Sequence, residues 1–111
     1  MIGWSATICA SINQEVVHGI PGGRQLQDGD LLSVDVGARC QRYYGDGATT
    51  IAIGTIAPRA RRLMDTCRRA LQQGIAAIGP GRRLADLSRA VQGYVESNGF
   101  AVVRDLVGHG V

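Results

Sequence analysis

Alternating apolar and polar positions predict three strands in the first half of the chain. Residues 7–13 alternate apolar with small or polar side chains, which is typical of a strand with one buried face. Residues 31–39 and 42–54 predict two longer strands. We expect a turn near residues 40–42 to join these two strands.

The same alternation assigns side chains to the two faces of the predicted sheet. Val34 and Val36 point to one face, and Asp35 points to the other, between small side chains. If the two longer strands pair in antiparallel fashion, Asp35 and Asp46 can meet on one side of the sheet.

The period then changes and predicts two helices. Pro58 lies near the start of the first helix, and the sequence at 79–81, Gly-Pro-Gly, ends it. Its apolar stripe consists of Leu63, Cys67, Leu71, Ile75 and Ile78. The second helix carries the stripe Leu84, Leu87, Val91 and Val95. Arg83 is a poor N-cap, and Asn98-Gly99 forms the C-terminal cap.

Residues 100–107 are apolar and rich in β-branched side chains, so we predict a final strand there. The order of strands, two helices and a strand indicates an α+β fold. A chain of 111 residues is long enough for one small domain with one core.

Composition excludes several classes of protein. The three cysteines form no C-x-x-C pair, which argues against a disulfide framework or a zinc ribbon and favours the cytoplasm. We predict no signal peptide and no membrane partner. The net charge of +3 is too small for a dedicated nucleic-acid binder, so we expect no specific nucleic-acid partner.

Two features of the sequence allow more than one interpretation. Arginines cluster at Arg59, Arg61, Arg62, Arg68 and Arg69. A solvated helix face explains them better than a phosphate-binding patch. His18 is either a buried imidazole or a hydrogen-bonding group at the edge of a cleft, and the residues alone do not decide between these alternatives.

Two carboxylates and one imidazole are candidate metal ligands. Asp35, Asp46 and His109 supply oxygen and nitrogen donors that suit a divalent metal ion. Taken singly, each residue is more often solvent-facing, capping or part of a turn. Glycines flank Asp46 and His109, and glycine lets the backbone and a ligand approach closely.

Together these segments resemble the type I methionine aminopeptidases, metallopeptidases with the pita-bread fold. The matching residues are ICASINQEVVHGIP at 8–21, GDLLSVD at 29–35, GD at 45–46, GF at 99–100, VVR at 102–104 and GHG at 108–110. Order, spacing and neighbouring residues agree across nearly the whole chain.

The resemblance assigns roles to individual residues. Asp35, Asp46 and His109 correspond to ligands of two divalent ions, which would be Co, Mn, Fe, Ni or Zn. His18 corresponds to a catalytic histidine that contacts the substrate near the scissile bond. Substrate-binding positions that line the methionine side-chain pocket correspond to Trp4, Cys9 and Val17.

The resemblance also implies a fold and an activity. The fold is the N-terminal half of the pita-bread architecture, an antiparallel sheet with two helices, so that residues 1–111 form a partial catalytic domain. The activity is removal of initiator methionine from nascent polypeptides, and the resemblance allows the ribosome as a partner.

The family needs two glutamates and a second histidine after His109, and N-terminal helices that this sequence lacks. We therefore expect a domain truncated at both ends, with little activity in the 111-residue chain alone. The alternatives are a catalytically dead binding module and one half of a split enzyme.

Overall fold

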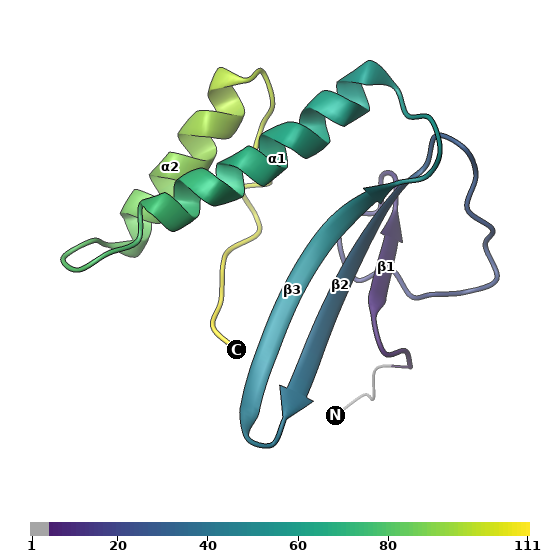
Figure 1. Ribbon diagram of the computed structural model, residues 1–111, viewed down its shortest axis with the longest axis horizontal. Coiled ribbons are helices and arrows are strands. Elements are labelled where there is room, and N and C mark those ends of the chain that lie inside the picture. The colour runs from purple at the N-terminus through teal and green to yellow at the C-terminus, as the bar shows by residue number, and fades with distance from the viewer. Residues whose placement is uncertain (1–4) are drawn as a thin grey trace. The chain divides into compact units, whose positions relative to one another are not determined.

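The chain divides into two compact units. The computed structural model describes residues 5–111, and Trp4 lies outside the described residues. We call residues 1–57 together with 109–111 the strand unit, and residues 58–108 the helical unit. Figure 1 shows the strands and the helices that form the two units.

The strand unit contains the three predicted strands. These are β1 (Cys9–Ile12), β2 (Leu31–Cys40) and β3 (Tyr43–Ala52), in the spatial order β1-β2-β3 with both pairs antiparallel (Figure 1). Cys40 pairs with Tyr43, which leaves a turn of two residues at the predicted position. Gln41 has a φ of 56° in this turn, and tight hairpin turns need positive φ at their centre. The predicted pairing of the two long strands is confirmed.

The helical unit contains both predicted helices, α1 (Pro58–Ala76) and α2 (Leu84–Ser97). Pro58 is the first residue of α1, where its missing N–H costs no hydrogen bond. Thr66, Ala70 and Gly74 are the buried residues of α1. They recur every four residues and form a face of small side chains that allows close packing. A Cβ at Gly74 would lie 2.9 Å from Val91 Cγ2, so α2 packs closely against this face.

The apolar stripe that predicted α1 is not its buried face. Leu71, Ile75 and Ile78 are 58%, 52% and 64% exposed, and Cys67 is also exposed. The spacing correctly predicted a helix, but α2 packs on the neighbouring small residues because they let the two backbones come close. Hydrophobicity alone therefore predicted the wrong packing face within this unit.

Caps at both ends of α2 use backbone and side-chain groups. The N-cap residue Arg83 has no side-chain acceptor, but Asp86 Oδ2 accepts a hydrogen bond from the Arg83 backbone N–H at 3.0 Å. At the other end, Gly99 has a φ of 77°, and Asn98 Nδ2 donates to the Tyr94 carbonyl at 2.8 Å. The predicted C-terminal cap is confirmed.

The predicted final strand over residues 100–107 is wrong. This segment contains neither helix nor strand, and its backbone forms a turn in which Leu106 N–H donates to the Val103 carbonyl at 3.4 Å. A strand is stabilised by a neighbour that completes its hydrogen bonds, whatever its own propensity. The described helical unit contains no strand that could serve as this neighbour.

Each unit buries few side chains. The buried apolar residues among 5–111 are Ile12, Ile56, Ala70 and Val95. Large apolar side chains remain exposed in both units, as expected for part of a larger fold. Among residues 5–111, neither helix combines the length and the apolar character that crossing a membrane requires.

Candidate metal-binding face of the sheet

The register of the sheet brings the two candidate aspartates to one face. Cys9 pairs with Asp35, and Asp35 pairs with Ala48. Two residues further along, Gly37 pairs with Asp46. Directly paired residues point to the same side of an antiparallel sheet, and so do residues two apart on one strand. We call this side of the sheet, which carries Cys9, Asp35 and Asp46, the carboxylate face.

Asp35 and Asp46 are diagonal neighbours on the carboxylate face. Diagonal positions lie about 7–8 Å apart in antiparallel sheets, a span that two carboxylates can bridge through a shared ion. The residues directly opposite them are Ala48 and Gly37, which have almost no side chain. Asp35 is half-buried, and the Asp46 side chain is 34% exposed. The sheet therefore leaves room beside both carboxylates for a ligand.

His109 also belongs to the strand unit, and its ring faces Asp46. His109 Nε2 lies 4.0 Å from Asp46 Oδ2, and His109 Nδ1 lies 3.0 Å from the Gly110 carbonyl. If Nδ1 carries the proton, it donates to that carbonyl, and Nε2 keeps a lone pair that could bind a cation. The imidazole is 71% exposed.

The three candidates do not form a compact cluster. In the part of the chain that the structure describes, no group of three or more histidine, cysteine or acidic side chains is arranged to hold a metal ion. Asp46 and His109 are close to each other, and Asp35 shares the carboxylate face with Asp46. The two carboxylates and the imidazole are donors that suit a divalent ion. Their arrangement would supply part of its coordination shell.

The candidate substrate-binding residues lie at two places. Cys9 is half-buried and lies on the carboxylate face opposite Asp35. Val17 and His18 lie on the loop that follows β1, and both are exposed. The exposure of His18 excludes the buried-imidazole alternative. Trp4 lies outside the described residues, so its place in a pocket stays a prediction.

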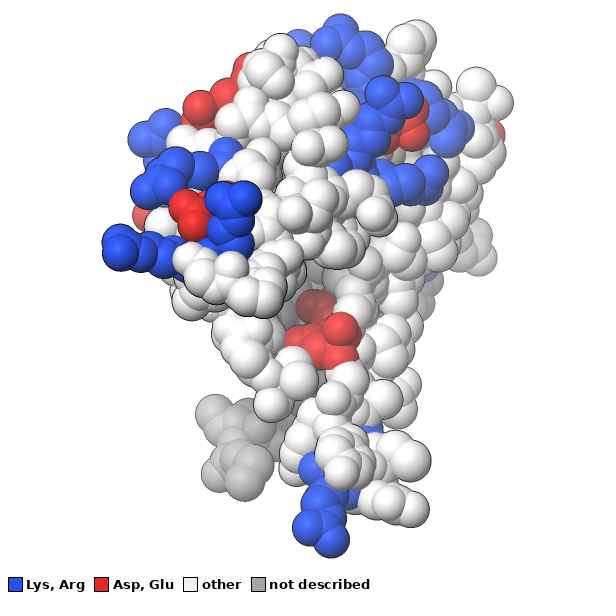
Figure 2. All heavy atoms as spheres, turned by 60° about the vertical axis from the view of Figure 1, so that its left-hand side comes forward, with Lys and Arg blue, Asp and Glu red and all other residues white. Residues whose placement is uncertain are grey.

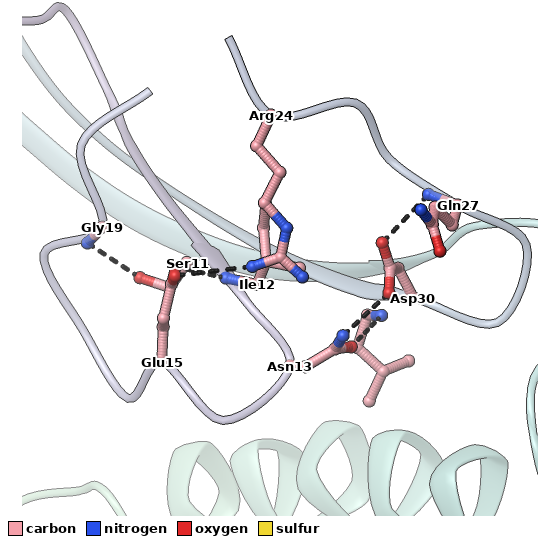
Figure 3. A network of polar contacts seen from close by, with 9 residues as sticks. Ser11, Ile12, Asn13, Glu15, Gly19, Arg24, Gln27 and Asp30 are labelled. Atoms are coloured by element: carbon pink, nitrogen blue, oxygen red, sulfur yellow. Dashed lines mark hydrogen bonds and ion pairs between the residues drawn. The ribbon is translucent and has the colours of Figure 1, made fainter. Parts of the chain in front are cut away.

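A network of polar contacts fixes the loop that carries His18, and no sequence pattern predicted this network. Figure 3 shows the loop tied to β1 and to the start of β2. Asn13 has a φ of 55° and directly follows Ile12, the last residue of β1. Its amide donates to Asp30 Oδ1 at 2.7 Å, and its Oδ1 accepts the Leu31 N–H at 2.9 Å. An asparagine at the end of the predicted strand over residues 7–13 is the signal that could have indicated this junction.

Asp30 completes this junction. Its Oδ2 accepts a hydrogen bond from the Gln27 backbone N–H at 2.9 Å. This bond, the Asn13 amide and the positive charge of Arg24 lower the pKa of Asp30 below its usual value of 3.8. The carboxylate form of Asp30 therefore stabilises the turn between β1 and β2.

The arginines of α1 lie on an exposed helix face. Arg59, Arg61, Arg62, Arg68 and Arg69 are all exposed. Figure 2 shows basic side chains gathered over the helices, with acidic ones among them. Arg62 donates to the Asn98 carbonyl at 3.2 Å, and its guanidinium lies 5.7 Å from the centre of the Phe100 ring. These contacts fit the interpretation of a solvated helix face.

Comparisons with known proteins give consistent matches. The model of metallopeptidase family M24 matches residues 1–111. "Methionine aminopeptidase 1" of Bacillus subtilis (strain 168) is 46% identical over 109 residues, which cover 98% of this chain and 44% of that protein. The methionine aminopeptidase of Clostridium acetobutylicum is 48% identical over 110 residues, with the same two shares. The chain thus spans less than half the length of these relatives.

Solved structures agree with the sequence matches. The methionine aminopeptidase of Rickettsia prowazekii superposes with a TM-score of 0.94 at 38% identity, over 98% of this chain and 44% of that one. The prolidase of Pyrococcus furiosus reaches a TM-score of 0.77 at 21% identity, over 85% of this chain and 28% of that one, which supports the fold alone. The predicted α+β, pita-bread architecture with an antiparallel sheet and two helices is confirmed.

Proposed function

Because this chain belongs to metallopeptidase family M24, we propose that residues 1–111 form part of the catalytic domain of a methionine aminopeptidase. The activity is metal-dependent removal of initiator methionine from nascent polypeptides in the cytoplasm. The observation that carries the proposal is the shared face of Asp35 and Asp46, with the ring of His109 4.0 Å from Asp46. The names of the relatives support the substrate.

The proposed metal ligands are Asp35, Asp46 and His109. Asp46 lies between the other two in this proposal, since it shares the sheet face of Asp35 and its carboxylate lies near the His109 ring. Asp46 would therefore hold a divalent ion together with either neighbour. The carboxylate and imidazole donors accept Co, Mn, Fe, Ni or Zn, and they do not select among these metals.

The chain's own residues would prepare the site in two ways. Asp35 and Asp46 supply two negative charges that favour divalent cations. His109 supplies a nitrogen donor while its Nδ1 is oriented by the Gly110 carbonyl. Bound divalent ions would polarise the scissile carbonyl and activate water, which is the chemistry that peptide hydrolysis needs.

His18 is the proposed catalytic residue on the substrate side of the site. Its exposed position on the loop beside β1 leaves it accessible to a peptide. Cys9 lies on the carboxylate face, so it suits a wall of the methionine side-chain pocket, together with Trp4 and Val17. A thiol packs well against the thioether of methionine because both groups are polarisable.

Three donors are too few for two metal ions, so activity requires further ligands. Zinc takes about four ligands, and larger hard ions take about six or more. We therefore expect little or no turnover of a Met-Ala-Ser peptide by the 111-residue chain. In a chimera, residues 1–111 replace the matching segment of the Bacillus subtilis relative, which supplies the remaining length. We expect Mn²⁺- or Co²⁺-dependent turnover by this chimera.

Substitutions in the chimera test the proposed ligands. Asp46→Asn keeps the size of the side chain but removes its charge, so we expect a loss of activity of about 100-fold, the upper end of the losses caused by removing a partner of a metal ligand. Asp105→Asn is the matched control, because Asp105 is exposed and lies in the helical unit. An active Asp46→Asn variant with unchanged metal content would overturn the ligand assignment.

A binding module is the second candidate function, and the exposed arginines of α1 are the contact surface that it would use. Guanidinium groups bind phosphates in two-pronged fashion, which suits ribosomal RNA or another polyanion. RNA binding that weakens steeply with salt and is lost in the Arg61→Ala/Arg68→Ala variant would support this function. Binding that survives this double substitution would reject the helix face as the contact.

A further inference from the structure

The loop between β1 and the start of β2 is tied back to the free edge of β1. The Gly19 carbonyl accepts a hydrogen bond from the Ala10 N–H at 2.8 Å, and Ser11 Oγ accepts one from the Gly19 N–H at 3.0 Å. Both polar groups of Gly19 are therefore bonded to consecutive residues of one strand. Figure 3 shows Gly19 directed at the Ser11 hydroxyl.

The Ser11 side chain is well suited to hold the loop. Ser11 is 3% exposed, so its hydroxyl is shielded from competing water. Ser11 lies two residues after Cys9 on β1 and therefore points to the carboxylate face. This hydroxyl connects the face that carries the proposed metal ligands to the loop that carries His18.

The contact requires a glycine at position 19. A Cβ at Gly19 would meet the carbonyl oxygen and carbon of Ala10, which are backbone atoms and cannot move aside cheaply. The loop can therefore approach β1 closely only where the side chain is absent. This requirement gives a physical reason for the His-Gly pair at 18–19.

The bond from Gly19 N–H fixes the peptide group that follows His18. His18 has a φ of 59°, in the left-handed region that residues with a side chain rarely adopt. Such a conformation persists where the surroundings hold it in place. The Ser11 hydroxyl and the Ala10 N–H hold the residue directly after His18.

We infer that Ser11 is a positioning residue, which sets the backbone of His18 through its hydrogen bond to the Gly19 N–H. Glu15 supports the same loop, since its Oε2 accepts the Ile12 N–H at 2.8 Å and its Oε1 lies 3.7 Å from an Arg24 nitrogen. This inference rests on the proposed contact between His18 and the substrate.

Amide hydrogen exchange tests the geometric half of the inference. In the 111-residue chain, Ser11→Ala should raise the exchange rate of the Gly19 amide roughly five- to tenfold, the effect of losing one hydrogen bond. Ser33→Ala is the matched control, because the Ser33 hydroxyl bonds Thr50 Oγ1 at 2.9 Å and not the loop. Unchanged Gly19 exchange in Ser11→Ala, or an equal rise in Ser33→Ala, would overturn the inference.

A double-mutant cycle in the chimera tests the functional half. Ser11→Ala should lower kcat/KM roughly tenfold at unchanged metal content, and Ser11→Thr, which keeps the hydroxyl, should restore most of it. On a His18→Ala background, Ser11→Ala should cause no further loss. Ser88→Ala, on the exposed surface of α2, should leave activity unchanged.

The outcomes separate this inference from the proposed function. A further tenfold loss on the His18→Ala background would show that Ser11 acts independently of His18 and would overturn the inference. A chimera without any peptidase activity would overturn the proposed function. The exchange rate of the Gly19 amide would then show by itself whether Ser11 holds the loop. If Ser11→Ala does not fold, Ser11→Cys, which keeps the size and weakens the acceptor, takes its place in both experiments.

Discussion

The strand unit and the helical unit use polar side chains in different ways. In the strand unit, side chains join residues far apart in sequence, as in the bond from Asn13 to Asp30 and the bond from Thr55 N–H to Asp28 Oδ1. In the helical unit, most side-chain bonds join residues three or four apart, such as Arg89 to Asp86. The first pattern fixes loops in space, whereas the second stabilises a helix that already exists.

The two units also differ in charge. The strand unit contains three arginines and five acidic residues, whereas the helical unit contains nine arginines and four acidic residues. The acidic excess lies where the sheet register can bring carboxylates together. The candidate chemistry therefore belongs to the strand unit, and the helical unit presents a basic surface.

The largest difference between the units should appear in the cost, in unfolding free energy, of replacing a closely packed glycine by alanine. Gly19→Ala places a Cβ against the backbone of Ala10, so we expect a loss of about 2 kcal/mol or more in unfolding free energy. At Gly74→Ala, a gain of about 1 kcal/mol in helix propensity offsets the contact with Val91, so we expect a net change near zero.

Urea denaturation of both variants measures this difference. Gly23→Ala is the control, since nothing lies within 4 Å of a Cβ at that position. Equal losses at Gly19 and Gly74 would contradict the distinction between a rigid backbone contact and a side-chain contact.

A smaller effect should follow from the cap of α2. Asp86→Ala removes the acceptor of the Arg83 N–H and the partner of Arg89, so we expect a loss of about 1 kcal/mol. The loss should be confined to the helical unit, because these bonds are local. Amide exchange resolved by residue checks this, and faster exchange in β1 and β2 would contradict the expectation.

The stability of the turn before β2 should depend on pH. The lowered pKa of Asp30 means that the folded state favours the carboxylate form. Its contribution is complete above the unfolded value of 3.8 and is lost as the pH falls through the lower folded value. Asp30→Asn should therefore reduce stability at pH 7, and the difference from the original chain should vanish in strong acid.

Urea midpoints at a series of pH values test this dependence. Asp105→Asn is the control, because Asp105 is exposed and lies in the helical unit. A difference between Asp30→Asn and the original chain that stays constant down to the lowest pH would mean that the charge of Asp30 does not contribute.

The smallest effect concerns the reactivity of the Cys67 thiol. Desolvation raises the pKa of the Cys67 thiol above 9.0, so at pH 8 less of it is thiolate, the nucleophilic form. Cys67 should react with iodoacetamide more slowly than the same cysteine in a peptide of residues 63–71. A pH–rate profile whose midpoint equals that of the peptide would show that desolvation does not raise the pKa of Cys67.

Local patterns predicted most of the elements. Alternation over residues 31–39 and 42–54 predicted the long hairpin and the shared face of Asp35 and Asp46, because the side-chain period of two follows from strand geometry. The spacing after Pro58 predicted α1 in the same way. The prediction failed at residues 100–107, where the propensity for strand met no neighbouring strand.

The candidate site could be predicted only in part. The resemblance indicated Asp35, Asp46 and His109, but no local pattern indicates that the His109 ring lies near Asp46, 63 positions earlier. Ser11 gave no signal, since a serine in a strand is unremarkable until Gly19 returns to it. Contacts of this kind depend on the path of a loop, which sequence periodicity does not describe.

By itself, the sequence determined the three strands, the two helices, their order and the faces of the sheet, because these follow from local backbone geometry and from alternation. Only the tertiary structure decided that Thr66, Ala70 and Gly74 form the buried face of α1, and that Ser11 holds the loop of His18. The reason is that packing and loop closure depend on how closely two backbones can approach, and this is fixed by partners distant in sequence.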